Sequence, residues 1–235
     1  MPIMGHLEEL RRRLMVVAIA VIVGVLISFY FIGDVVDFLL KIPEEVIIIS
    51  PAEAFFAHIR LAIVAGIVVT LPITIYQIIA FLLPGLSPRE RIYLLLGLPS
   101  ALFLFAIGVI FAYIVILPLA YDFFMTFAAG GIDPSVTLGN YISFIKGLLL
   151  PFGVVFQLPL MVLLLTGIGI ITPDFLKRNR KIVLLIVFLL AAFLTPPDVV
   201  SQAFMAGPLL LLYEISIVIS GLAFRRRSTP EVLKD

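Results

Sequence analysis

Two adjacent glutamates stand before the first apolar run of the chain, in the stretch HLEELRRRL at residues 6–14. On a helix, Glu8 and Arg12, and likewise Glu9 and Arg13, are spaced four residues apart in the order that favours an ion pair. Such pairs would stabilise a helix at the membrane interface. Acidic residues influence membrane orientation little, so topology does not require the two carboxylates. They create local negative sites on an otherwise basic surface.

A third glutamate, Glu90, lies close to an apolar run, on the side of the predicted membrane that also carries Glu8 and Glu9. Glu90 ends the stretch SPRE (residues 87–90), which places Ser at the N-cap, Pro at N1 and Glu at N3 of a helix. The carboxylate of Glu90 therefore has a structural task in a capping box. It is also a second candidate for a negative site on this face.

Two polar residues fall deep inside apolar runs. Gln157 lies eleven residues past Lys146, and Glu214 lies eleven residues past Ala203, in two runs expected to be parallel helices. We therefore predict both side chains at similar depth, facing one another or a shared cavity. An acidic residue at the centre of a spanning helix costs about 2.5 to 3.5 kcal/mol, so Glu214 should not face lipid. A protonated Glu214 that serves helix packing and a functional Glu214 are both compatible with the sequence.

Other chemistry finds little support in the residue types. The chain has no cysteine, and its two histidines, His6 and His58, lie far apart in sequence, which argues against a metal centre. Both histidines also lie outside the apolar runs, which argues against an intramembrane serine protease. The sequence contains no P-loop, dinucleotide fingerprint or HExxH motif. We therefore expect neither an enzyme nor a bound cofactor.

The composition defines the elements that must position these side chains. Of the 235 residues, 63% are hydrophobic and 13% are charged, and the mean hydropathy is +1.25, which predicts an integral membrane protein. A spanning helix needs ~20 apolar residues. We predict an all-α protein with a single domain over residues 1–235 and six transmembrane helices. The spans lie at about residues 14–32, 61–83, 92–117, 147–170, 182–194 and 203–224.

Basic residues predict the orientation of these spans. With the N-terminus inside, only Lys41, Arg60 and Lys146 of the 16 Lys and Arg residues lie outside. Both termini are then cytoplasmic, in agreement with an even number of spans. The arginines at 225–227 directly follow a span and are typical of a topology anchor, not of a nucleic-acid site.

Helix start signals and prolines predict the lengths and bends of the helices. SPAE at residues 50–53 predicts a helix from Pro51 to Leu83, whose ~50 Å exceeds the ~30 Å hydrocarbon core. A helix from Pro88 has no stop before residues 128–131, and Thr172 begins another helix. We expect the outer extensions of these helices, together with residues 37–49, to form a partly apolar extracytoplasmic cap. The prolines inside or at the edges of the spans imply kinked helices and a concave bundle. They are Pro72, Pro99, Pro118, Pro151, Pro159 and Pro208.

Four stretches in this order resemble the TatC family, the core membrane component of the twin-arginine protein translocase. They are HLEELRRRL at 6–14, FLLPGLSPRER at 81–91, FGVVFQLPL at 152–160 and LTPPDVVSQ at 194–202. The resemblance covers nearly the whole chain. It implies a protein of the cytoplasmic (inner) membrane that binds twin-arginine signal peptides of folded precursor proteins at the cytoplasmic face. It further implies an oligomeric complex with the single-span partners TatA and TatB, and transport driven by the proton-motive force.

The resemblance also assigns roles to individual residues. Signal-peptide binding falls on Glu9, Arg11 and Glu90, with Phe81 and Pro84 shaping the first cytoplasmic loop. Carboxylates suit this role because they hold guanidinium groups in bidentate geometry. Asp198 lies in the outer connection between the fifth and sixth spans.

One position departs from the family and one alternative stays open. Many family members carry a glutamate where this chain has Gln157, so a proton-carrying role at that position is not expected, whereas a hydrogen-bonding role is.

The alternative function is a proton- or ion-coupled small-solute transporter with Glu214 as the coupling acid. That alternative predicts solute flux without partners, whereas the translocase interpretation predicts binding of peptides that contain the arginine pair.

Overall fold

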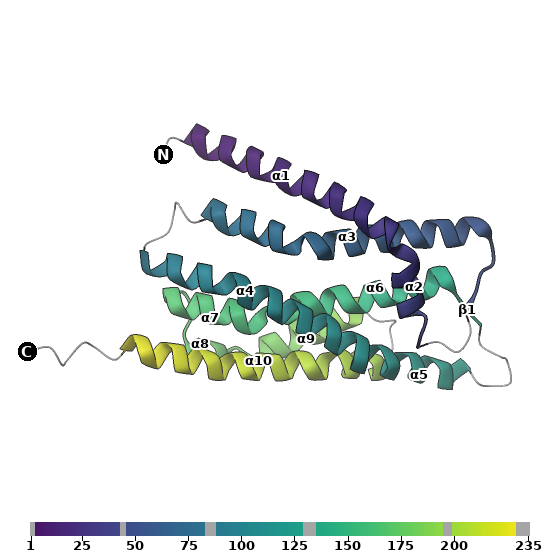
Figure 1. Cartoon of the computed structure of the whole chain (residues 1–235). Helices are drawn as coiled ribbons and strands as arrows, with labels where there is room; N and C mark the ends of the chain where they lie inside the picture. The colour runs from purple at the N-terminus through teal and green to yellow at the C-terminus, as the bar shows by residue number, and fades with distance from the viewer. Residues whose placement is uncertain (1–2, 43–45, 83–87, 129–134, 195–198, 229–235) are drawn as a thin grey trace, which may run out of the picture. The chain divides into compact units, whose positions relative to one another are not determined.

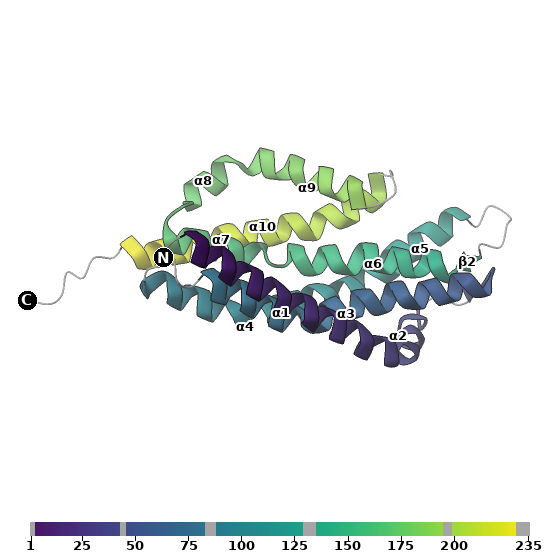
Figure 2. The same ribbon diagram turned by 90° about the horizontal axis from the view of Figure 1, so that it is seen from above.

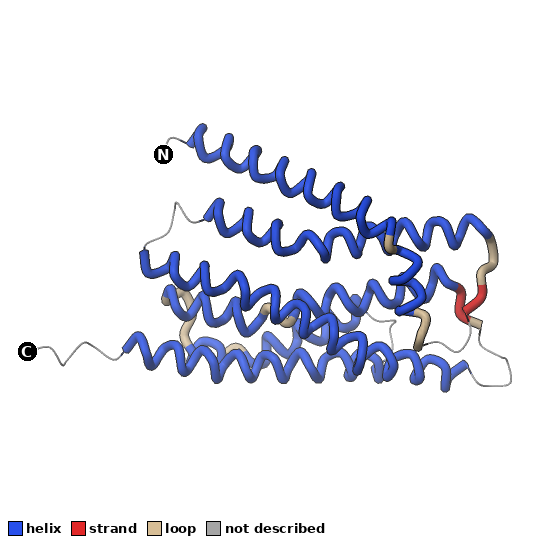
Figure 3. Tube along the Cα trace, in the orientation of Figure 1, coloured by secondary structure: helices blue, strands red, loops and turns tan. Residues whose placement is uncertain are grey.

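Helices make up nearly all of the computed structural model, which describes residues 3–42, 46–82, 88–128, 135–194 and 199–228. Two short parallel strands, β1 (Val46–Ile47) and β2 (Val136–Thr137), accompany the helices (Figures 1 and 3). The predicted all-α fold class is therefore confirmed. In chain order the helices are α1 (Ile3–Tyr30), α2 (Ile32–Leu39), α3 (Pro51–Leu82), α4 (Pro88–Phe111), the π-helix η2 (Ala112–Ile116), α5 (Leu117–Ala128), α6 (Leu138–Val155), α7 (Leu158–Ile168), α8 (Pro173–Arg178), α9 (Arg180–Leu194) and α10 (Val199–Ser228).

Five helical stretches within the described residues are long and apolar enough to cross a membrane. They are Met4–Tyr30, Pro51–Phe81, Gly97–Thr126, Leu138–Gly167 and Met205–Leu222. Each overlaps one of the predicted spans. The remaining predicted span corresponds to α9, whose 15 residues extend only ~22 Å. The count of six spans and the cytoplasmic placement of both termini stay predictions.

The chain divides into two compact units by its internal packing. The first combines Met1–Leu86 with Phe124–Lys146, and the second combines Ser87–Phe123 with Gly147–Asp235. The predicted single domain, concave bundle and extracytoplasmic cap stay predictions.

The first unit is built on the packing of α1 against α3 (Figure 1). The two helices approach closely at glycines, because a Cβ on Gly66 would lie 2.5 Å from the backbone nitrogen of Val25. A Cβ on Gly24 would likewise lie 2.5 Å from Cγ2 of Thr70. The hydroxyl of Thr70 donates to the Gly66 carbonyl, at 2.8 Å, so this polar group is satisfied within its own helix. Small residues at helix contacts are typical of membrane proteins, where close backbone packing replaces the hydrophobic effect.

Glu53 fastens the two strand-bearing loops of the first unit. Ser50 caps α3 as predicted, because its hydroxyl accepts from the Glu53 N–H at 3.2 Å. The Glu53 carboxylate accepts from the Ile49 N–H at 3.1 Å and from the Gly139 N–H at 2.9 Å. The Thr137 hydroxyl also hydrogen-bonds to it. One carboxylate thus joins the start of α3 to the segment around β2, 86 residues away in sequence.

We expect Glu53→Gln to loosen these two loops. The amide has one acceptor oxygen, and its NH₂ group would face backbone N–H donors, so at least one hydrogen bond is lost. Amide hydrogen exchange of peptides covering 46–50 and 135–141 should become about five- to tenfold faster. Asp34→Asn, a comparable change at an exposed acid on α2, serves as the control. Equal exchange in both variants would contradict this role of Glu53.

The second unit is organised around α10. This helix contacts α7, α8 and α9, and Figure 2 shows α8 and α9 beside it. A buried cluster joins α7, α8 and α10: Val162, Leu176, Tyr213 and Ile217. Buried polar groups of this unit form hydrogen bonds with one another, for example the Tyr213 hydroxyl, which donates to the Leu176 carbonyl at 2.8 Å. Thr166 and Ser220 likewise share a buried hydrogen bond of 2.8 Å.

Helix limits follow the local signals, and the helical path from Pro88 contains one interruption. The predicted helix from Pro51 is described as far as Leu82, and its predicted end at Leu83 lies outside the described residues. The helical path from Pro88 continues to Ala128 as predicted, but its π-turn at 112–116 was not foreseen. In α8, the Thr172 hydroxyl accepts from the Phe175 N–H at 3.2 Å, which confirms the predicted cap.

Candidate functional site

The N-terminal part of α1 and the C-terminal part of α3 together build a polar site in the first unit. Both Nε and Nη2 of Arg13 donate to Oε1 of Glu9, at 3.0 and 2.6 Å. Nη1 of Arg13 donates to Oε1 of Gln77 on α3, at 3.1 Å. The Arg13 guanidinium therefore links the carboxylate on its own helix to an amide on the neighbouring helix.

One of the two predicted ion pairs is formed. The Glu9–Arg13 pair is partly buried, with side chains 25% and 24% exposed. Glu8 and Arg12 are exposed, and within the described residues no ion pair joins them. The Glu9–Arg13 pair is also tied to α3, because Arg13 donates to Gln77 of that helix.

A cavity of about 350 Å³ opens beside this pair. It is lined by Glu9, Arg12, Arg13, Val16, Tyr76 and Gln77. The lining offers a carboxylate, an amide and a phenol, which can all accept hydrogen bonds from a guanidinium group. Among the described residues, Oε2 of Glu9 has no hydrogen-bond donor. Oε2 of Glu9 therefore remains available to accept a further hydrogen bond.

Phe81 joins the same end of the unit, although not as a loop residue. It lies in the last turn of α3, and its ring stacks on His6 of α1, with centroids 4.2 Å apart. It also lines a smaller cavity of about 100 Å³ together with Leu10, Arg13 and Gln77. The structure thus brings together Glu9 and Phe81 from the predicted site.

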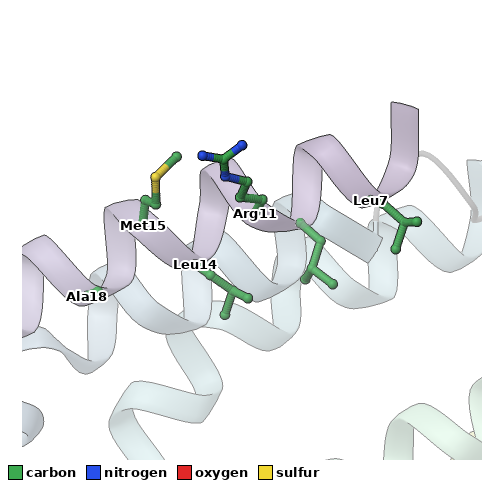
Figure 4. A pocket seen from close by; sticks show the side chains of 6 residues that line it. Leu7, Arg11, Leu14, Met15 and Ala18 are labelled. Carbon is green, nitrogen blue, oxygen red and sulfur yellow. The ribbon is translucent and has the colours of Figure 1, made fainter. Parts of the chain in front are cut away.

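Arg11 lies on a different face of α1 from Glu9. Two residues along a helix correspond to a rotation of roughly 200°, which carries Arg11 away from the α3 side. Its exposed side chain points to the same side of α1 as Met15, along a shallow groove of about 420 Å³ (Figure 4). Leu7, Leu14 and Ala18 also line this groove. The structure does not place Arg11 beside Glu9.

Three other predicted positions are described only in part or not at all. Glu90 lies in the first turn of α4, and its side chain is not described. Pro84 and Asp198 lie outside the described residues. Their predicted roles stay predictions.

Gln157 occupies a break between α6 and α7. Its own N–H bonds to the Val154 carbonyl at 3.0 Å, instead of to Gly153 four residues back. Its side-chain NH₂ replaces that bond to the Gly153 carbonyl at 3.3 Å and also donates to the Ala101 carbonyl of α4 at 3.1 Å. Pro159 explains the break, because it has no N–H to continue the helix. Two carbonyl acceptors suit an amide, so these contacts agree with the predicted hydrogen-bonding role.

Glu214 pairs with a residue that sequence reasoning did not connect to it. Its Oε2 accepts from Nη2 of Arg180 at 2.7 Å, and both side chains are about half exposed. Arg180 is the first residue of α9, so the pair fastens that end of α9 to α10. Gln157 and Glu214 therefore have separate partners, and a shared cavity between them stays a prediction. The Glu214 carboxylate is therefore engaged in an ion pair within the second unit.

No sequence signal indicated the contacts that Tyr76, Gln77 and Arg180 make. Tyr76 and Gln77 follow a proline within an apolar run and carry no motif of their own. Arg180 belongs to a basic cluster whose topological role explained it fully. Only the spatial arrangement reveals their partners.

Comparisons with family models, with related proteins and with solved structures all indicate the same family. Residues 5–208 match the family model described as Sec-independent protein translocase protein (TatC). A Sec-independent protein translocase protein TatC of Carboxydothermus hydrogenoformans is 40% identical over 225 residues, covering 94% of this chain and 93% of the relative. The corresponding protein of Escherichia coli (strain K12) is 37% identical over 226 residues, covering 93% and 88%. A crystal structure of the twin arginine translocase receptor TatC has a TM-score of 0.80 and 38% identity, covering 93% of this chain and 99% of that one.

Proposed function

Because the chain belongs to the TatC family of Sec-independent protein translocase proteins, we propose that it binds the twin-arginine signal peptides of folded precursor proteins. The observation that carries this proposal is the Glu9 carboxylate beside the cavity of α1 and α3, with Oε2 available to a guest. A guanidinium group matches a carboxylate in shape and charge better than any other side chain does. The chain needs no covalent chemistry for this task.

Further residues enter the proposal through the family resemblance. We assign Glu90 to a second carboxylate contact and Phe81 and Pro84 to the shape of the first cytoplasmic loop. Arg11 belongs to the same functional stretch. Its position on another face of α1 favours a contact with a different part of the peptide or with a partner subunit.

The chain is a multi-pass membrane protein and a subunit of a protein translocase. We propose that it lies in the cytoplasmic membrane with both termini inside, because this orientation leaves only three basic residues outside. We further propose that it works in an oligomeric complex with TatA- and TatB-type single-span subunits, and that transport uses the proton-motive force.

The small-solute transporter finds no support. The relatives are protein translocase subunits, and the acid that would couple protons, Glu214, is held by Arg180. The translocase function therefore explains the chain better.

The test is peptide binding to the purified full-length protein in lipid nanodiscs. A signal peptide with the arginine pair should bind at least about tenfold more tightly than the same peptide with two lysines, because lysine cannot form the bidentate contact. Titration of a fluorescent peptide measures both affinities. Equal affinities would contradict the proposed function.

A further inference from the structure

Arg13 is hydrogen-bonded to the Glu9 carboxylate, which in the proposed function binds an arginine of the signal peptide. Its Nε and Nη2 both donate to Oε1 of Glu9, at 3.0 and 2.6 Å. We propose that Arg13 is a built-in occupant of this site, which an incoming guanidinium must displace to gain both oxygens of Glu9. This inference rests on the proposed function and adds a regulatory element to the same site.

The geometry of the contact supports an occupant that can be exchanged. A full arginine–carboxylate contact uses two parallel hydrogen bonds to two oxygens. Arg13 reaches only Oε1, so its hold on Glu9 is incomplete. With Arg13 in place a guest finds one oxygen, and with Arg13 displaced it finds two.

Gln77 gives the displaced guanidinium a second partner. Its Oε1 accepts from Nη1 of Arg13 at 3.1 Å, from the neighbouring helix α3. A charged group that leaves its counter-ion needs another hydrogen-bond acceptor, because an unpaired buried charge is costly. The amide of Gln77 already provides one such acceptor.

The neighbouring arginines do not share this arrangement. Arg11 lines the groove on the other face of α1, and Arg12 is exposed with no hydrogen bond or ion pair to any described residue. Arg12 and Arg13 both line the 350 Å³ cavity and carry the same charge. Replacing either one changes the long-range attraction for a cationic peptide equally, whereas only replacing Arg13 frees Glu9.

The test compares three variants of the full-length protein in nanodiscs by titration with the arginine-pair peptide. Arg13→Gln should bind the peptide about three- to tenfold more tightly than the wild type, because the competing ion pair is gone. Arg13→Lys keeps the charge but loses the fork, so its affinity should rise about two- to threefold. The affinity of Arg12→Gln for the peptide should rise less than that of Arg13→Gln, because only the long-range attraction changes.

The outcomes separate this inference from the proposed function. If the wild type prefers arginine over lysine peptides but neither Arg13 variant binds more tightly, the occupant role is wrong. It is also wrong if Arg12→Gln gains as much affinity as Arg13→Gln, or if Arg13 variants bind more weakly because Arg13 orients Glu9. Should Arg13→Gln fail to fold, Arg13→Lys decides the question alone. A wild type that does not prefer arginine peptides overturns the proposed function itself.

Discussion

Glu9→Lys is expected to weaken binding of the arginine-pair peptide by roughly 30- to 1,000-fold. The substitution removes a carboxylate acceptor and places a like charge against the guest, which together are worth about 2 to 4 kcal/mol. The new lysine would also face Arg13 four residues later, so both cations would repel the peptide. Titration of a fluorescent signal peptide against the variant in nanodiscs measures the loss.

Glu8→Lys is the matched control for this prediction. It produces the same change in net charge one residue away, on an exposed side chain that makes no ion pair with any described residue. Long-range electrostatics alone would weaken both variants equally. A Glu8→Lys variant that loses as much affinity as Glu9→Lys would show that no specific site exists at Glu9. Thermal unfolding of Glu8→Lys should stay close to that of the wild type, whereas Glu9→Lys should be slightly less stable because Arg13 loses its partner and gains a like charge.

Features that depend on neighbouring residues could be predicted from the sequence. Ser50 and Thr172 cap their helices in the structure because an N-cap bond needs only the next three residues. The apolar runs match the long helices because helix length in a membrane is set by the chain's own hydropathy. The break at Gln157 agrees with the bends expected from prolines, since Pro159 lacks a backbone donor.

Features that depend on distant residues could not be predicted. Arg13 and Gln77 are 64 residues apart, and no periodicity connects them. Arg180 was explained as a topology charge, and its bond to Glu214 needs the packing of α9 on α10. The π-turn at 112–116 also follows no local signal, because one extra residue in a turn is a response to packing.

The candidate site could be predicted from the sequence only in part. The family motif indicates Glu9 and Phe81, and the structure brings both to one end of the first unit. The same motif groups Arg11 with Glu9, whereas the helix separates them onto different faces. A motif records which residues occur together in sequence, and only the helix face decides which of them can share a ligand.

Gly66→Ala is expected to destabilise the first unit by about 1 to 3 kcal/mol through overpacking. The added methyl group would lie 2.5 to 2.6 Å from the backbone N and Cα of Val25, and neither atom can rotate away. Helices α1 and α3 would have to separate by roughly 1 Å to reach ordinary contact distance. Gly5→Ala, in a part of α1 where a Cβ meets nothing within 4 Å, is the control. It should be neutral or slightly stabilising, because alanine favours the helix more than glycine does.

The separation of α1 from α3 should also reach the binding site. The bond between Nη1 of Arg13 and Oε1 of Gln77 spans the same two helices at 3.1 Å, and a shift of roughly 1 Å would break it. We therefore expect Gly66→Ala to lower the thermal midpoint of unfolding and to change the affinity for the arginine-pair peptide, although Gly66 lies eleven residues before Gln77. Differential scanning fluorimetry and peptide titration on the same preparations measure both effects. A variant as stable as Gly5→Ala would mean that α1 and α3 are not in close backbone contact at Gly66, and the site built across them would lose its support.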